Sequence, residues 1–314
     1  MQLETVAWPG SYGEQVKPRM GFFTDTSVCI GCKACEVACK EWNQIPMAIE
    51  GFSGKSYDNS LELDANRWRH VAFIEQKVPA GVTDGASLAQ AAARGEAVDG
   101  GVATYQEGDG FRWLMASDVC KHCTDAACLD VCPTGALFRT EFGTVVVQPD
   151  VCNGCGTCVA GCPFGVVERR SDGTYATPVE RPGRSAEKFV TGVAQKCTLC
   201  YDRLVEDQIP ACAKTCPTTS IKFGDHDELV VRARERVAEL HAQGRTEARL
   251  YGANEHDGVG GTGSIFLLLD EPEVYCLPPD PRVCTADLMQ MFKRAGVGAA
   301  GMFGAAALAF WRSR

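Results

Sequence analysis

The hydrophobic pattern divides the chain into strand-forming segments, a polar excursion and an apolar tail. Residues 67–78 and 111–120 alternate apolar and polar side chains, which predicts two strands that pair with each other. Residues 263–272 contain a short, continuous apolar run, which predicts a buried strand. Between the first two strands, residues 79–110 are polar and rich in glycine and alanine, so we expect a surface excursion with one short helix.

Two more elements follow from the same pattern. Asp227 is placed to cap a helix that runs to His241, with Gly244 just beyond its end. The apolar face of this helix would consist of Val230, Ala233, Val237 and Leu240. Residues 135–150 predict a short hairpin that turns at 142–143 and returns along three consecutive valines.

The composition changes after the proline-rich segment at 277–281, which predicts a boundary. Residues 295–311 carry no charge and could just cross a hydrocarbon core as a helix. Phe310 and Trp311 suit a membrane–water interface. We therefore expect a transmembrane helix within residues 285–314 that anchors the chain in a membrane. The alternative is a tail that docks on a soluble partner.

Composition narrows the class of protein. The chain has 314 residues and a formal net charge of −9, which argues against a nucleic-acid binder. It also has 18 cysteines. Disulfide-dense proteins are typically short and secreted, whereas this chain is long and its start shows no signal-peptide pattern. The cysteines are therefore expected to bind metal.

Sixteen of the cysteines form four motifs of four. The motifs are Cys29, Cys32, Cys35 and Cys39; Cys120, Cys123, Cys128 and Cys132; Cys152, Cys155, Cys158 and Cys162; and Cys197, Cys200, Cys212 and Cys216. The first and third have the C-x2-C-x2-C-x3-C spacing of bacterial ferredoxins, although Lys40 replaces the usual proline after the first. Zinc sites also use such pairs but separate them more widely, so the spacing predicts iron–sulfur clusters.

In two-cluster ferredoxins the fourth cysteine of each motif ligates the other cluster. The close second and third motifs would form one module, and the first and fourth motifs would pair across the intervening chain. This predicts four [4Fe–4S] clusters held by four sets. Set 1 is Cys29, Cys32, Cys35 and Cys216; set 2 is Cys39, Cys197, Cys200 and Cys212; set 3 is Cys120, Cys123, Cys128 and Cys162; and set 4 is Cys132, Cys152, Cys155 and Cys158.

Several residues near the motifs allow two interpretations. His122 is interpreted as an exposed loop histidine, with hydrogen bonding to a cluster as the alternative. Lys33, Lys121 and Lys196 are either solvated or close enough to raise a cluster's potential. The remaining cysteines, Cys276 and Cys284, have no partners at ligand spacing and are interpreted as ordinary thiols.

The order of the four motifs resembles the beta subunit of the complex iron–sulfur molybdoenzymes over residues 20–285. Within that group, residues 20–46, 67–76, 236–252 and 275–281 are most similar to membrane-bound formate dehydrogenase iron–sulfur subunits. Nitrate reductase relatives often have tryptophan in the third motif, where this chain has Cys155. The Ala/Gly-rich insertion at 79–104 and the weak tail helix depart from the resemblance.

The resemblance implies an electron-transfer subunit that has no catalytic residues of its own. Its partners would be a catalytic alpha subunit with a molybdenum or tungsten bis-pterin cofactor, which oxidises formate, and a membrane gamma subunit with haem b or a quinone site. The chain would lie at the bacterial inner membrane. The resemblance does not decide between the periplasmic and the cytoplasmic face. The alternatives are a beta subunit of a polysulfide, tetrathionate, dimethyl sulfoxide or nitrate reductase, or a soluble polyferredoxin.

The expected fold class is α+β, with two ferredoxin-like modules that each hold two clusters. Module A would comprise residues 20–60 and 190–280, and module B residues 116–189. A strand-containing insertion at 61–115 and the C-terminal helix complete the predicted organisation.

Overall fold

A computed structural model of the chain describes residues 17–46, 54, 57–78, 110–170, 192–286 and 288–312. The short helix predicted within the polar excursion falls on residues 79–109, outside the described part. The predicted domain boundaries stay predictions.

A four-stranded sheet forms the centre of the molecule. It contains β8 (Ile221–Asp225), β1 (Met20–Asp25), β10 (Ser264–Leu268) and β9 (Arg249–Tyr251), in that order. β1 pairs antiparallel with β8 and parallel with β10. All five residues of β10 are buried, as expected of a continuous apolar strand inside a sheet, and this confirms the predicted buried strand.

The sheet joins segments from both ends of the body. Thr24 of β1 pairs with Ile221 of β8, so the end of β1 meets the start of β8. There, the Asp25 amide donates to the Ser220 carbonyl at 2.8 Å and the Ser220 hydroxyl donates to the Asp25 carbonyl at 2.7 Å. The first motif follows β1 and the fourth motif precedes β8, so this pairing places the two motifs side by side.

A long antiparallel ribbon lies beside this sheet. β2 (Arg69–Val78) and β3 (Gly110–Val119) pair in register from Arg69 with Val119 to Val78 with Gly110. This confirms the pairing predicted from their alternating pattern. The end of β3 leads into the second motif, and the Ser264 hydroxyl of β10 donates to the Cys120 carbonyl at 2.9 Å.

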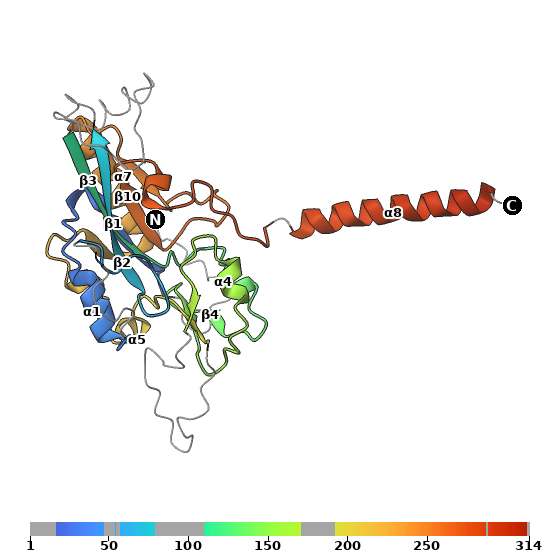
Figure 1. Ribbon diagram of the computed structural model, residues 1–314, viewed down its shortest axis with the longest axis horizontal. Helices are drawn as coiled ribbons and strands as arrows, with labels where there is room; N and C mark the ends of the chain where they lie inside the picture. Colours follow the sequence, from blue (N-terminus) through green and yellow to red (C-terminus); the bar gives the residue numbers. More distant parts are fainter. Residues whose placement is uncertain are drawn as a thin grey trace, which may run out of the picture.

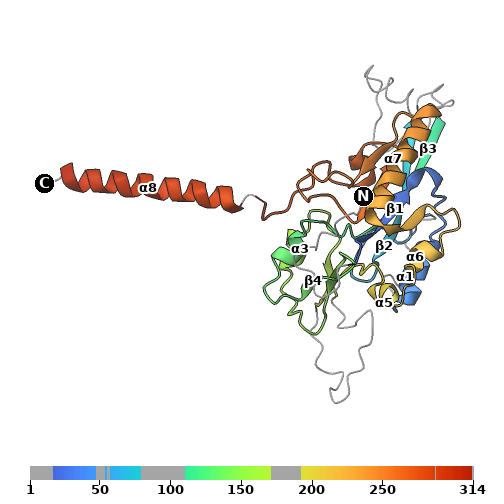
Figure 2. The ribbon, with the colours of Figure 1, turned by 180° about the vertical axis from the view of Figure 1, so that it is seen from behind.

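Short elements surround the motifs. They are η1 (Thr26–Val28), α1 (Ala34–Trp42), α3 (Ala127–Asp130), β4 (Leu137–Arg139), β5 (Val145–Val147), α4 (Thr157–Gly161), β6 (Glu168–Arg169), β7 (Ala194–Gln195), α5 (Tyr201–Val205) and α6 (Ala211–Lys214). β4 and β5 form the predicted hairpin, with Gly143 at a φ of 75° in its turn. Figures 1 and 2 show α1 and α5 together on one side of the body and β4 with α3 and α4 on the other.

Helix α7 (His226–Ala242) covers the sheet, but it starts earlier than predicted. The side chain of Asp225, not that of Asp227, accepts the first amides, from Asp227 and Glu228. Its buried residues are His226, Leu229, Ala233 and Leu240. The prediction of Asp227 as the cap is therefore wrong, because strand β8 runs directly into the helix and its last residue takes the capping position.

The last elements are η3 (Pro272–Tyr275) and α8 (Leu288–Arg312). Helix α8 extends away from the body (Figures 1 and 2), and its Phe303, Phe310 and Trp311 are exposed. No helix in the described part of the chain has both the length and the hydropathy needed to cross a membrane. The predicted transmembrane helix at 295–311 is therefore not supported. The helix forms, but it is built mainly of Ala and Gly, which contribute little apolar surface.

Replacing Leu267 tests the importance of the central sheet. Leu267 on β10 is fully buried, so Leu267→Ala should reduce the free energy of unfolding by about 3 kcal/mol through lost burial and a residual cavity. Anaerobic urea unfolding followed by circular dichroism would measure this loss. Val231→Ala on α7, where Val231 is 53% exposed, serves as the control and should change the midpoint little. Equal midpoint shifts in the two variants would contradict this account of the core.

Candidate functional site

Each motif lies on a tight loop that leads into a short helix. In the first motif, Gly31 and Lys33 have φ values of 64° and 58°, and Lys33 immediately precedes α1. Consecutive amides in such turns point into one concavity, which favours negative charge. Cys35 and Cys39 follow four residues apart, so both lie on the buried face of α1.

The other loops repeat this backbone design. The third motif has Gly154 and Gly156 at φ values of 71° and 79°, and the Gly154 amide lies 3.4 Å from the Cys152 Sγ. In the fourth motif, Leu199 and Cys200 have φ values of 59° and 50°. The Leu199 amide lies 3.3 Å from the Cys197 Sγ. Residues in these loops therefore already direct amides at thiol sulfurs.

Two hollows are lined by complete predicted sets. The cysteines of set 1 line a hollow between the first and fourth motifs. Those of set 3 line a hollow between the second and third motifs. Both hollows are partly open to solvent. In each, the fourth cysteine comes from the other motif of the pair.

In each of the other two sets, one thiol has a pKa that the remaining three cysteines raise. Burial raises the pKa of the Cys39 thiol well above its usual value, and the remaining cysteines of set 2 raise it further. Burial raises the pKa of Cys158 to about 11, and the remaining cysteines of set 4 raise it further. All sixteen predicted site residues lie in the described part of the chain, and their assignment to four sets stays a prediction.

The four sets follow one another in a row. Electrostatic interactions between thiols link set 1 to set 2, set 2 to set 3, and set 3 to set 4. The linking pairs are Cys35 with Cys212, Cys197 with Cys120, and Cys128 with Cys158. The two ends of the row reach the surface, because Cys32 in set 1 and Cys155 in set 4 are exposed.

Buried donors without a partner point to a missing anion. Arg69 is 1% exposed and lies among thiols of sets 1 and 2, which raise the pKa of its guanidinium despite the opposing effect of burial. Its Nη1 donates to the Ser117 hydroxyl at 2.9 Å, but its Nε and Nη2 have no hydrogen-bond partner among the residues that the structure describes. An unsatisfied buried guanidinium is costly, so these groups fit an anionic cluster between the thiols.

The second motif shows where the interpretation of single residues from sequence was wrong. His122 is 2% exposed, not an exposed loop residue, and its Nδ1 accepts from the Val145 amide at 3.1 Å. Burial and the cations around it lower the pKa of His122 well below its usual value. Its buried Nε2 has no hydrogen-bond partner in the described part of the chain, and His122 lines the same hollow as set 3. Lys121 and Lys196 are also buried rather than solvated.

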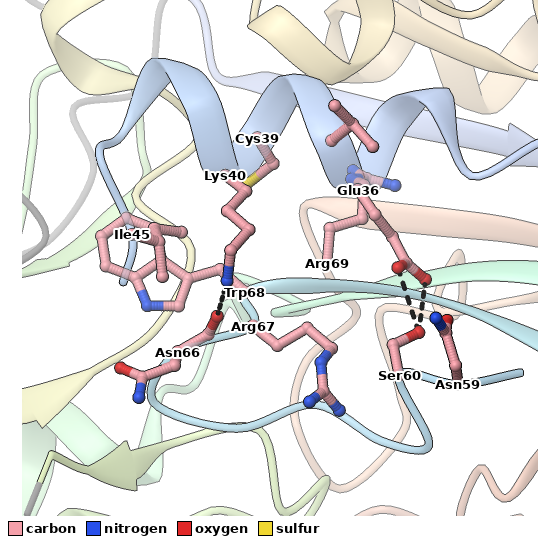
Figure 3. A pocket seen from close by; sticks show the side chains of 11 residues that line it. Glu36, Cys39, Lys40, Ile45, Asn59, Ser60, Asn66, Arg67, Trp68 and Arg69 are labelled. Carbon is pink, nitrogen blue, oxygen red and sulfur yellow. Dashed lines mark hydrogen bonds between the residues drawn. The ribbon is translucent and has the colours of Figure 1, made fainter. Parts of the chain in front are cut away.

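A surface pocket lies against the outer face of α1, beside Cys39 (Figure 3). Lys40 extends from the helix across this pocket and donates to the Asn66 carbonyl at 3.4 Å, while Ser60 contacts the Glu36 carboxylate at 3.0 Å. His70 and the Val71 amide, which both hydrogen-bond to the Glu36 carboxylate, together with the charge of Lys33, hold the pKa of Glu36 below its usual value despite burial. These contacts fasten the first motif to the segment that precedes β2.

The geometry that the thiols need depends on the group that they bind. In the described part of the chain, no group of three or more His, Cys, Asp or Glu side chains could hold one metal ion. The four thiols of a cubane bind four different irons, so they need not converge on one point. Cys276 and Cys284 are exposed free thiols outside the four sets.

Comparisons with known proteins agree with this chemistry. Models of the 4Fe-4S dicluster domain match residues 28–136, 111–179 and 174–226. A formate dehydrogenase iron–sulfur subunit of Haemophilus influenzae is 36% identical over 279 residues, covering 88% of this chain and 73% of the relative. The nitrate-inducible formate dehydrogenase iron–sulfur subunit of Escherichia coli K12 is 36% identical, covering 88% of this chain and 79% of the relative.

The chain belongs to the family of formate dehydrogenase iron–sulfur subunits. It is similar over less of its length to a thiosulfate reductase electron transfer subunit of Salmonella typhi, at 33% identity over 70% of this chain. The predicted α+β fold with two dicluster modules and a C-terminal helix is confirmed, as are the four [4Fe–4S] clusters and the electron-transfer role without catalysis by this chain.

Gly31 provides a test of the loop geometry. A Cβ at Gly31 would lie 2.7 Å from the Phe73 ring and 2.9 Å from the Met115 sulfur, at a φ of +64°. Gly31→Ala should therefore lose roughly a quarter of the bound iron, the share of one cluster in four. Iron analysis after anaerobic purification would measure this loss. Gly135→Ala, at a φ of +66° with no atom within 4 Å, is the matched control and should keep its iron. Full iron in Gly31→Ala would show that close approach is not required.

Proposed function

We propose that sets 1 to 4 each ligate one [4Fe–4S] cluster and that each motif exchanges its fourth cysteine with its partner motif. The hollows lined by complete sets 1 and 3, and the thiol neighbours of Cys39 and Cys158, support this assignment. When bound, the clusters supply one-electron transfer. The chain's own residues space the four sets, exclude water from the inner sets and direct amides at the thiols.

We propose that the chain relays electrons from a catalytic partner that oxidises formate. The observation that carries this proposal is the row of four sets, because linked sets with an exposed cysteine at each end can connect two partners. The iron–sulfur subunits named for formate dehydrogenase align over 88% of the chain. The thiosulfate and dimethyl sulfoxide reductase relatives align over 70% and 67%, which favours formate as the partner's substrate.

The two ends of the row suggest two partners. We propose that a catalytic subunit with a molybdenum or tungsten bis-pterin cofactor contacts the chain near Cys32. We further propose that a membrane subunit with haem b or a quinone site receives electrons near Cys155, which would hold the chain at a bacterial inner membrane. Cys32 lies in the module built from the first and fourth motifs, and Cys155 in the other, so electrons would cross the body from one module to the other.

Substitution of Cys216 tests the ligand assignment. Cys216→Ser should weaken the set 1 cluster, so the electron paramagnetic resonance signal that it loses should match the signal lost in Cys32→Ser. Cys276→Ser replaces an exposed thiol outside the sets and should leave the spectrum unchanged. If Cys216→Ser instead loses the signal that Cys200→Ser loses, motifs one and four do not exchange ligands.

Reconstitution tests the relay. The isolated chain should not reduce a dye with formate, because it contains no catalytic constellation, but its clusters should be reduced by formate once the catalytic partner is added. Anaerobic absorption spectroscopy would follow cluster bleaching in both mixtures. In a parallel trial, thiosulfate or dimethyl sulfoxide is added to the reduced complex as an electron acceptor. Reoxidation of the clusters by one of these compounds would favour a reductase over a formate dehydrogenase. Bleaching by formate without any partner would overturn the relay.

A further inference from the structure

A buried lysine lies at the junction of sets 2 and 3. Lys196 follows β7 and immediately precedes Cys197 of set 2, and it is 2% exposed. Its ammonium lies 3.6 Å from the Cys120 Sγ of set 3 and donates to the Cys197 carbonyl at 3.0 Å and to the Val145 carbonyl. One side chain thus contacts both sets where the two modules meet.

The charge of Lys196 is not neutralised by a carboxylate. Within the described part of the chain its partners are two carbonyls and a thiol. Lys121, which is equally buried, differs because its ammonium pairs with the Asp118 carboxylate. A buried cation without an ionic partner is strongly unfavourable, so the site of Lys196 requires a lasting negative charge nearby.

Set 3 is where that negative charge would be. Burial raises the pKa of Cys128 to about 12, and among the nearby charges Lys196 opposes this rise most. A [4Fe–4S] cluster with four thiolate ligands is an anion, and reduction adds one more negative charge. A fixed cation therefore stabilises the reduced form more than the oxidised form, which raises the reduction potential.

We propose that Lys196 is a positioning residue that raises the reduction potential of the set 3 cluster and so favours electron passage from set 2 to set 3. The inference rests on the ligand sets proposed above. It attributes the difference in reduction potential that drives electrons from one module to the other to one side chain. The loops provide the spacing of the clusters. Lys196 touches the ligand Cys120 and acts through its charge, without taking up or releasing a proton.

Redox titration of the purified full-length chain tests this role. Lys196→Met should lower the midpoint potential of one cluster by about 59 mV, a tenfold change in its one-electron reduction equilibrium. Lys196→Arg keeps the charge and should restore most of the potential. Lys222→Met removes a half-buried lysine that lies over the Phe23 ring and should leave that cluster's potential unchanged. Unchanged potentials in a fully loaded Lys196→Met chain would overturn the proposal.

A spectroscopic measurement avoids dependence on the folding of the methionine variant. In wild-type chain labelled with ¹⁵N-lysine, pulsed electron paramagnetic resonance should detect a weak nitrogen coupling to a reduced cluster. That coupling should disappear in Lys196→Arg. Its absence from the wild-type chain would contradict the contact, whereas a wild-type chain without [4Fe–4S] signals would instead refute the proposed ligand sets.

Discussion

In the proposed ligand sets, the fourth cysteine of each motif joins the first three cysteines of another motif, and this exchange requires the fold to bring the paired motifs together. Cys216 can reach the first motif because β1 and β8 pair where one enters the first loop and the other leaves the fourth. Cys162 and Cys132 need only the short hairpin β4–β5 between their motifs. The central sheet therefore brings together the first and fourth motifs, which are distant in the sequence. The β4–β5 hairpin does the same for the second and third motifs, which are close.

The inner sets add an electrostatic requirement. Arg69 and Lys196 are almost fully buried, and among the described residues Arg69 has donors that no protein atom accepts. A core with such cations is stable only when anions neutralise them. Cluster binding and folding are consequently coupled, because the clusters supply charge that the protein interior lacks.

The sequence predicted the features that depend on local spacing. The sixteen cysteines, the β2–β3 ribbon and the β4–β5 hairpin follow from patterns within a few residues. The surroundings of His122 and Lys196 did not follow. Both side chains hydrogen-bond to Val145, which is distant in the sequence, and they are buried where the two modules meet. A pattern within a few residues does not predict such long-range contacts. The transmembrane prediction for the tail failed for another reason. It relied on the absence of charge, which does not by itself give a helix the hydropathy needed to cross a membrane.

The pairing of β1 with β8 also has a consequence for biosynthesis. Cys29, Cys32 and Cys35 emerge from the ribosome long before Cys216, so the first loop is synthesised without its fourth neighbouring thiol. The second and third motifs, in contrast, are complete once Cys162 has emerged. Before the fourth motif is made, a nascent chain thus presents one finished half and the four thiols of the first motif, which still lack their partners.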